Sequence, residues 1–363
     1  MSFELKPYRK PDFNEKKFIE APDVKIVCVE KDGVVPDDFH ATSIFPEYFK
    51  VNGEWLCATQ SRMDCVPVLE EGKILSKEAR RVKKGDKVII GRSEDCEDGI
   101  YVHNNGFADD SNAADPFAFR KNRSRETSFS KEYDEICELL KYERDNGNIL
   151  WVLGPALSFD RNARDAFAAL VNNGYVDGVC AGNALATHDL EAAYLHTALG
   201  QNIYTQENVH NGHYHHLETI NKVRGDGSIK EFIKNKNIDN GIMWALEKND
   251  IPYVLAGSIR DDGPLPEVTG NVYEAQDRMR KLTDQATTVI CLATMLHTIA
   301  IGNMTPSYRV MKDGNIRQIY FYVVDISEFM VNKLADRGSL SSRSIITNVQ
   351  DFVAKVGKGL EVY

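Results

Sequence analysis

The sequence lacks the paired cysteines of a disulfide framework or a structural zinc site. Its seven cysteines are scattered, their number is odd, and none of them forms a CxxC pair. This spacing favours reduced thiols and a cytoplasmic location. No apolar run approaches the roughly 20 residues that cross a bilayer. The first residues, MSFELKPYRKPDFNEKK, also lack the apolar core of a signal peptide. We therefore expect no membrane contact.

Positive charge is also scarce, because 44 lysines and arginines stand against 54 acidic residues, for a net charge of −10. A general nucleic-acid binder would need a basic face, so we expect no nucleic-acid partner. The chain has no HExxH motif, and we expect no metal site. It also lacks the GxGxxG fingerprint, so a dinucleotide site must be argued from other features.

What is present divides the chain into four segments. Residues 1–22 form a polar N-terminal arm. Residues 23–103 contain short apolar runs separated by DG, NG, EG and KGD turns, which predicts a small β-rich domain. Residues 104–132 are polar and aperiodic, as in a linker or a lid. Residues 133–363 alternate strand-like and helix-like runs, and we expect them to form a Rossmann-like catalytic domain.

The strand-like runs of the last segment are apolar throughout, which is typical of strands covered on both faces. A helical segment between two of them places Ala163, Phe167 and Leu170 on one face. This alternation predicts an α/β fold with a doubly wound parallel sheet, whose ligands bind at the carboxyl ends of the strands. The runs are ILWVL (149–153), VDGVC (176–180), PYVLA (252–256), TTVICL (287–292) and IYFYVV (319–324).

Small or polar residues follow each of these runs. Small and hydroxyl-bearing loops let backbone N–H groups approach a ligand, and an acid such as Asp325 at a late strand end can bind ribose hydroxyls. Together they suggest a dinucleotide. The alternatives are tight strand-to-helix turns and, for Asp325, a helix cap. The candidates after the strands are Gly154, then Asn183 and Ala184, then Arg260, Asp261 and Asp262, then Thr294, Met295, Leu296 and His297, and last Asp325.

Charged and titratable side chains gather in the same part of the chain. Seven of the nine histidines fall between residues 188 and 297. We take His213 as a contact for substrate or phosphate, or as a proton carrier; a solvated helix start is the alternative. Arg260 suits a carboxylate or phosphate. Asp261 and Asp262 suit a ribose hydroxyl, a substrate ammonium or proton transfer, unless DDGP is only a surface turn.

Six long motifs resemble the archaeal-type ornithine cyclodeaminases and the C-terminal half of the bifunctional cyanobacterial arginine dihydrolase/ornithine cyclodeaminases. The resemblance implies a deoxyhypusine-synthase-like NAD-binding fold, tightly held NAD and a homodimer or homotetramer. It also implies NAD contacts from Asn183, Ala184, Asp262, the run 294–297, Asp325 and Asp336. The motifs are AGNALATHDLE (181–191), GHYHHLETIN (212–221), IPYVLAGSIRDDGPLPEV (251–268), EAQDRMR (274–280), TMLHTIAIGNMTPS (294–307) and VVDISEFMVNKLADRG (323–338).

One loop departs from the family pattern. Relatives usually carry a GGPAxxHTGG-like loop after the first Rossmann strand, where this chain has LGPALSFDRNARD. We expect an NAD-dependent ammonia-lyase that converts L-ornithine to L-proline through a cyclic imine. Arg260 would bind the carboxylate, and Asp261, Asp262 or His213 would handle the amine protons. The alternatives are oxidation, deamination or aminoalkyl transfer on another amino acid or polyamine, and a non-catalytic NAD-binding sensor.

Overall fold

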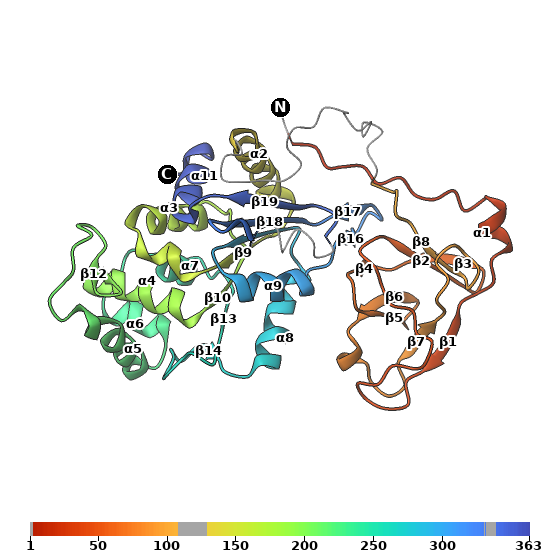
Figure 1. Ribbon diagram of the computed structural model, residues 1–363, viewed down its shortest axis with the longest axis horizontal. Helices are drawn as coiled ribbons and strands as arrows, with labels where there is room; N and C mark the ends of the chain where they lie inside the picture. The colour runs from red at the N-terminus through yellow and green to blue at the C-terminus, as the bar shows by residue number, and fades with distance from the viewer. Residues whose placement is uncertain (1–2, 108–128, 330, 332–338) are drawn as a thin grey trace.

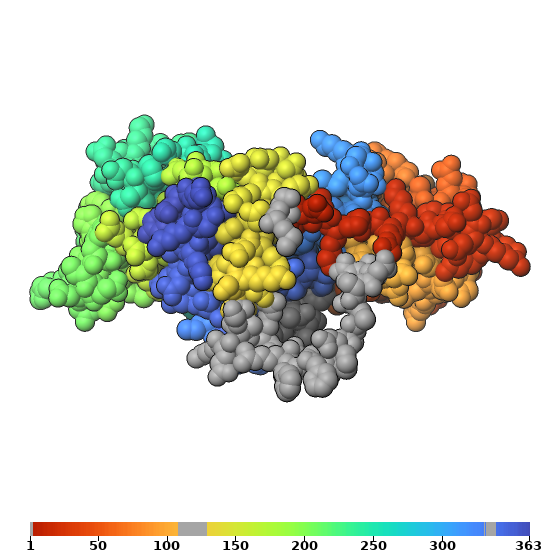
Figure 2. Space-filling view, turned by 90° about the horizontal axis from the view of Figure 1, so that it is seen from above, coloured from red at the N-terminus to blue at the C-terminus, as the bar shows by residue number. Residues whose placement is uncertain are grey.

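The protein is elongated, with an antiparallel β region at one end and a larger α/β region at the other (Figures 1 and 2). The computed structural model describes residues 3–107, 129–329, 331 and 339–363. Most of the segment 104–132 lies outside the described residues, and so does Asp336.

The β region is built from two small antiparallel sheets packed face to face. Two tight turns begin on Asn52 and Glu71, each followed by a glycine, and all four residues have positive φ. Such turns match the right-handed twist of a hairpin, so the NG and EG turns were correctly predicted. One sheet has the order β1 (Lys25–Cys28), β7 (Lys87–Ile90), β5 (Val66–Glu70), β6 (Lys73–Lys77), and the other β3 (Glu54–Cys57), β2 (Glu47–Val51), β8 (Ile100–Val102).

A hairpin from the C-terminal part of the chain joins the β region to the α/β region. Strands β16 (Tyr308–Val310) and β17 (Ile316–Gln318) pair with each other, and β16 pairs with β4 (Gln60–Ser61). Tyr308 is fully buried, and its hydroxyl donates to the Ala58 carbonyl at 3.2 Å. The two regions are therefore connected by a small three-stranded sheet, in the order β17, β16, β4, as well as by the chain (Figure 1).

The α/β region contains a seven-stranded parallel sheet, which confirms the predicted fold class. Its central strands are buried on both faces, as their apolar sequences required. The sheet has the order β14 (Val268–Thr269), β13 (Tyr253–Ala256), β10 (Gly178–Gly182), β9 (Ile149–Leu153), β15 (Thr288–Leu292), β18 (Tyr320–Asp325), β19 (Ser342–Ile346).

Helices cover both faces of this sheet (Figure 1). Helices α8 (Val272–Thr283) and α9 (Met295–Met304) pack together on one face. In the described part of the chain, every helix is too short or too polar to span a bilayer. The other face carries α2 (Ser130–Asn146), α3 (Arg161–Asn172), α4 (Asn183–Leu195), α7 (Ile242–Lys248) and α11 (Val349–Gly359), while α5 (His215–Asp226) and α6 (Ile229–Asn235) pack outside α4.

A buried ion pair fixes three of these helices relative to one another. Arg164 on α3 donates from Nε to Asp189 Oδ1 on α4 at 2.8 Å. The Asp189 carboxylate also accepts the backbone N–H groups of Ile242 and Met243, at 3.0 and 2.8 Å, and so caps α7. Both charged side chains are only 1 % exposed, so loss of either partner would leave an uncompensated charge in the core.

The order of the strands places a switch in direction beside β9. From β9 the chain adds β10, β13 and β14 on one side, and then returns to add β15, β18 and β19 on the other side. Helices diverge to opposite faces at such a point and leave a crevice at the carboxyl ends of the strands. The crevice therefore lies at the ends of β9 and β15.

Candidate active site

At the switch point two backbone segments touch with no side chain between them. The Gly154 N–H donates to the Leu292 carbonyl at 2.8 Å. A Cβ atom on Gly154 would lie 2.0 Å from the Ala293 carbonyl oxygen, so only glycine fits. Ala293 itself adopts a φ of 47°, which is uncommon for a residue with a Cβ. The floor of the crevice is thus bare backbone.

The helices that start at this edge have N-termini without side-chain caps. Gly182 and Thr294 occupy the N-cap positions of α4 and α9, and neither residue supplies a side-chain capping hydrogen bond. In contrast, Asp160 and Asn271 cap α3 and α8 with their side chains. The first N–H groups of α4 and α9 are therefore available to an anionic ligand at the crevice.

His297 connects the two sides of the crevice. From α9 it reaches across the end of β9, so that a Cβ on Gly182 would lie 3.1 Å from His297 Cε1. Its Nδ1 lies 3.3 Å from the Thr294 hydroxyl. Burial lowers the pKa of His297, and the nearby Asp261 carboxylate opposes that shift. The imidazole is therefore neutral at pH 7, with one nitrogen able to accept a proton.

The loop after β13 brings one of its three predicted charges to this histidine. Asp261 Oδ2 accepts the Ser258 N–H at 2.8 Å, which holds the turn closed. Arg260 and Asp262 are exposed, and within the described residues neither side chain makes a hydrogen bond or ion pair. Asn183 anchors the far end of the loop, because its Oδ1 accepts the Leu265 N–H at 3.0 Å.

A buried polar network on α4 was missed by the sequence reasoning. His188 Nδ1 lies 2.8 Å from Glu191 Oε2, and Thr197 donates to Glu191 Oε1 at 2.8 Å. His215 Nδ1 lies 2.7 Å from the Thr197 hydroxyl. Because the carboxylate only accepts and the Thr197 hydroxyl donates to it, the hydrogen-bond pattern places a proton on Nδ1 of both histidines.

This network lies close to the candidate crevice. The His188 ring contacts that of Phe159, at a centroid distance of 5.4 Å, in the 3₁₀ helix η2 (Pro155–Phe159) that directly follows β9. The His216 ring lies 6.2 Å from the His188 ring. The i, i+3 spacing of His188 and Glu191 on one helix was the available signal.

His213 was the predicted catalytic histidine, and the structure does not join it to the other candidates. It is exposed in the 3₁₀ helix η3 (Gly212–Tyr214), with its ring 4.2 Å from that of Tyr214. No hydrogen bond or ring contact among the described residues connects it to Asp261 or His297. Its catalytic role stays a prediction, and His188 is the better-supported histidine.

Asp325 ends β18 at the crevice edge, as predicted. Its Oδ1 accepts the Ser327 N–H at 2.8 Å. This hydrogen bond supports the alternative interpretation, in which Asp325 caps the segment that follows β18. A hydrogen bond from Asp325 to a ribose stays a prediction, as does the predicted contact from Asp336, which lies outside the described residues.

Large apolar side chains are exposed at three strand ends around the crevice. Ile259 follows β13, Met295 and Leu296 follow β15, and Ile326 follows β18; their exposed fractions run from 48 % for Met295 to 106 % for Ile259. Apolar surface gathered beside convergent polar groups is typical of a ligand-binding site. Among the residues that the structure describes, no three His, Cys, Asp or Glu side chains converge as metal ligands.

The sheet, its switch point and the bare helix N-termini define a Rossmann-type α/β protein with a ligand site at the strand ends. The family model for the C-terminal Rossmann fold of ArgZ-like arginine dihydrolases matches residues 134–356, and the model for the first C-terminal region of these proteins matches residues 46–128. The chain therefore belongs to the ArgZ-like C-terminal family, which confirms the resemblance found in the sequence.

Its relatives include named enzymes and solved structures. An ornithine cyclodeaminase of Methanopyrus kandleri is 37% identical over 94% of this chain and 80% of its own length. A LOR/SDH protein of Methanococcus maripaludis superimposes with a TM-score of 0.84 at 37% identity, over 94% of this chain and 98% of that one. A crystal structure of AgrE with ornithine and NAD⁺ has a TM-score of 0.60 at 31% identity, over 94% of this chain and 46% of that one.

Proposed function

We propose that the protein is an NAD-dependent ornithine cyclodeaminase, which converts L-ornithine to L-proline and ammonia. The observation that carries the proposal is the crevice itself: bare backbone at Gly154 and Ala293, flanked by the uncapped N-termini of α4 and α9. The choice of ornithine as substrate is based on the relatives, because curated members are named ornithine cyclodeaminase and AgrE was crystallised with ornithine and NAD⁺.

The residues at the crevice fit a dinucleotide. The free N–H groups at Asn183, Ala184 and Thr294 suit a pyrophosphate, and Gly154 lets the ligand approach the backbone. The exposed side chains of Met295 and Leu296 suit the flat faces of the bases. Asp325 Oδ2, Asp262 and Asp336 would serve the ribose hydroxyls. Bound NAD would supply the hydride acceptor for the substrate α-carbon and return the hydride to the cyclic imine.

The chain's own polar residues would hold the substrate and move its protons. Arg260 has no described partner, and its planar guanidinium suits the ornithine carboxylate. Asp261 lies near the neutral imidazole of His297, so this pair can take a proton from the substrate ammonium. His188, whose Nδ1 lies 2.8 Å from Glu191 Oε2, is a second imidazole beside the loop that follows β9.

A product assay tests this proposal. Purified protein is incubated with L-ornithine and NAD, and proline and ammonia are measured; L-lysine and putrescine are run in parallel. The proposal predicts equal amounts of proline and ammonia from ornithine alone. Release of ammonia from another amine without proline from ornithine would support the alternative of a different amine substrate, which rests on the divergent loop at residues 154–165.

A matched pair of arginine variants tests the substrate contact. Arg260→Gln should raise the KM for ornithine by roughly 10- to 150-fold, because a hydrogen bond to a charged group contributes about 1.5–3 kcal/mol. Arg92→Gln removes an exposed arginine of the β region, paired with Asp38 at 3.2 Å, and should leave KM unchanged. Equal KM values for the two variants would remove Arg260 from the site.

A further inference from the structure

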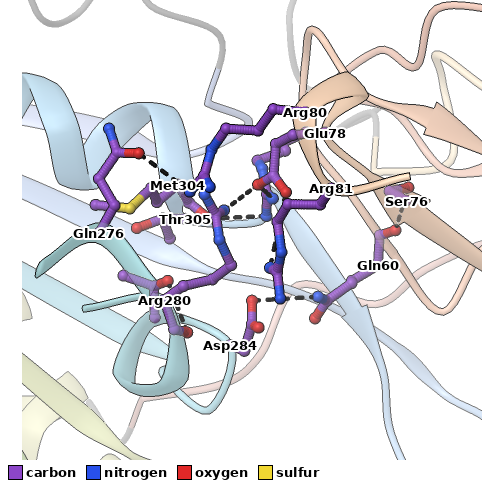
Figure 3. Close-up of polar contacts among 12 residues, drawn as sticks. Gln60, Ser76, Glu78, Arg80, Arg81, Gln276, Arg280, Asp284, Met304 and Thr305 are labelled. Carbon is purple, nitrogen blue, oxygen red and sulfur yellow. Dashed lines mark hydrogen bonds and ion pairs between the residues drawn. The ribbon is translucent and has the colours of Figure 1, made fainter. Parts of the chain in front are cut away.

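A second cleft lies between the β region and helices α8 and α9, away from the crevice. It has a volume of about 610 Å³, and none of its lining residues comes from the loops that follow β9, β10 or β13. Arg62, Glu78 and Arg80 enter it from the β region, and Tyr273 and Arg280 enter it from α8. Figure 3 shows Glu78, Arg80 and Arg280 meeting between the two regions.

Several guanidinium groups meet around one carboxylate at the centre of this cleft. One carboxylate, that of Glu78, faces three guanidinium groups: Arg62 and Arg280 contact Oε1, and Arg81 lies 3.7 Å from Oε2. Arg80 stands at the rim, where it donates to Gln276 at 3.2 Å and Asp277 at 3.0 Å. Asp64 lines the opening and is exposed to solvent. Asp284 is half-buried and its charge also acts on Arg280, so Glu78 and Asp284 stand against the guanidinium groups of Arg62, Arg81 and Arg280.

Arg280 is the least satisfied of these cations. It is only 5 % exposed, and its Nε has no hydrogen-bond partner among the described residues. Burial and the neighbouring Arg62 and Arg81 charges lower the pKa of Arg280 to about 10, and the Asp284 carboxylate opposes this shift only in part. A buried, charged donor without a partner is costly, since its hydration is not replaced.

We propose that this cleft binds a small oxyanion bearing a phosphate or carboxylate group, held jointly by Arg62, Arg80 and Arg280. An oxyanion would accept from the unpartnered Arg280 Nε and balance the positive charge that Glu78 and Asp284 leave uncompensated. Guanidinium groups match phosphate and carboxylate oxygens with paired, parallel hydrogen bonds. Because the arginines come from both regions, the bound anion would also fasten the β region to α8.

Space beyond the anion suits an organic portion of the ligand. The exposed Tyr273 ring and Met63 side chain line the same cleft, and the Arg80 guanidinium lies 5.3 Å from the Tyr273 ring centroid. Helix α9 contributes Ala300 and Gly302 to the wall, and these small residues leave the volume open. The site is therefore larger than a single phosphate ion requires.

Calorimetric titration with inorganic phosphate tests the proposal. The protein is first saturated with NAD, so that the helix N-termini at the crevice do not contribute, and ionic strength is held constant with chloride. Wild-type protein should bind one phosphate per chain. Arg280→Gln should weaken this binding at least about tenfold, since a hydrogen bond to a charged group contributes about 1.5 kcal/mol or more.

Two further variants keep the test decisive. Arg80 is 38 % exposed, so Arg80→Gln keeps the fold even where Arg280→Gln unfolds, and it should weaken phosphate binding several-fold. Arg92→Gln removes an exposed arginine that does not line the cleft, and it should bind like the wild type. Absence of phosphate binding to the wild type would overturn the proposal, and so would equal affinities of the Arg80→Gln and Arg92→Gln variants. A second calorimetric titration with citrate in place of phosphate then shows whether the cleft prefers a phosphate or a carboxylate ligand.

Discussion

A single methyl group at Gly154 should open the candidate crevice. In Gly154→Ala the new Cβ would lie 2.0 Å from the Ala293 carbonyl oxygen, whereas real Cβ atoms essentially never approach a heavy atom within 3.0 Å. The gap must therefore widen by at least about 1 Å. Both partners are backbone, held by the Gly154 hydrogen bond to Leu292 and by the Ala293 hydrogen bond to Val324, so no side chain can rotate away.

The expected cost follows from this geometry. Overpacking a well-packed site by one carbon destabilises a protein by about 1–3 kcal/mol, and here the strain falls on strands at the centre of the sheet. Displacing the floor of the crevice also moves the N-terminus of α9 relative to α4. We therefore expect NAD affinity to fall at least about tenfold, which corresponds to 1.4 kcal/mol.

Urea denaturation and NAD titration measure these two effects. Gly225→Ala is the matched control, because Gly225 lies on the exposed side of α5 with nothing within 4 Å of its Cβ position. That variant should be more stable by about 0.5–1 kcal/mol, since alanine favours a helix. The reasoning is wrong if Gly154→Ala matches the wild type within 0.5 kcal/mol and keeps its NAD affinity.

Three further predictions concern charges near the site. The pKa of His297 lies below that of an unfolded histidine. The stability that the neutral imidazole contributes is therefore complete above about pH 6.5 and is lost as the pH falls through the folded pKa. Urea denaturation at pH 7.5 and 5.5 measures this loss, and His297→Asn should remove it. Asp261→Asn should lower the pKa of His297 further in an NMR titration, and an unchanged value would show that the two groups do not interact. Arg164→Met should lower the free energy of unfolding by about 3–5 kcal/mol, because it leaves the buried Asp189 carboxylate without its cation. A loss below 1 kcal/mol would contradict that account.

The sequence predicted the strands whose apolar character is unbroken. The run at 149–153 coincides with β9, because five large apolar residues have no other stable place than a covered sheet. Strand β10 begins two residues later than predicted and ends on Ala181 and Gly182, small residues that carry no apolar signal. Strands β14 and β19 were missed, since one has two residues and the other is partly polar.

The site was predictable only to the level of the loops. The parallel sheet brings the residues after each strand to one edge, and this rule placed Gly154, Asn183 and His297 near one another. The rule does not say which side chains turn inward. His215 bonds to Thr197, which is 18 residues away, and that contact depends on how α5 packs against α4. For the same reason the sequence did not show that His213, one turn from His216, is exposed.

The same limit applies to the second cleft. Arg62 and Arg280 are more than 200 positions apart, and Glu78 joins them only because the β16–β17 hairpin pairs with β4. No local pattern in the sequence marks these arginines as neighbours. Their burial with one shared carboxylate is visible only in the folded chain.

Isotope labelling of the substrate tests the proposed reaction most directly. L-Ornithine deuterated at the α-carbon is incubated with the protein and NAD in ordinary water, and the product is analysed by mass spectrometry. A redox-neutral cyclodeamination removes the α-hydrogen as hydride and returns it to the same carbon. The account predicts proline that retains the deuterium, with no net accumulation of NADH. Proline that has lost the deuterium to solvent, or reduced cofactor formed in step with product, would contradict it.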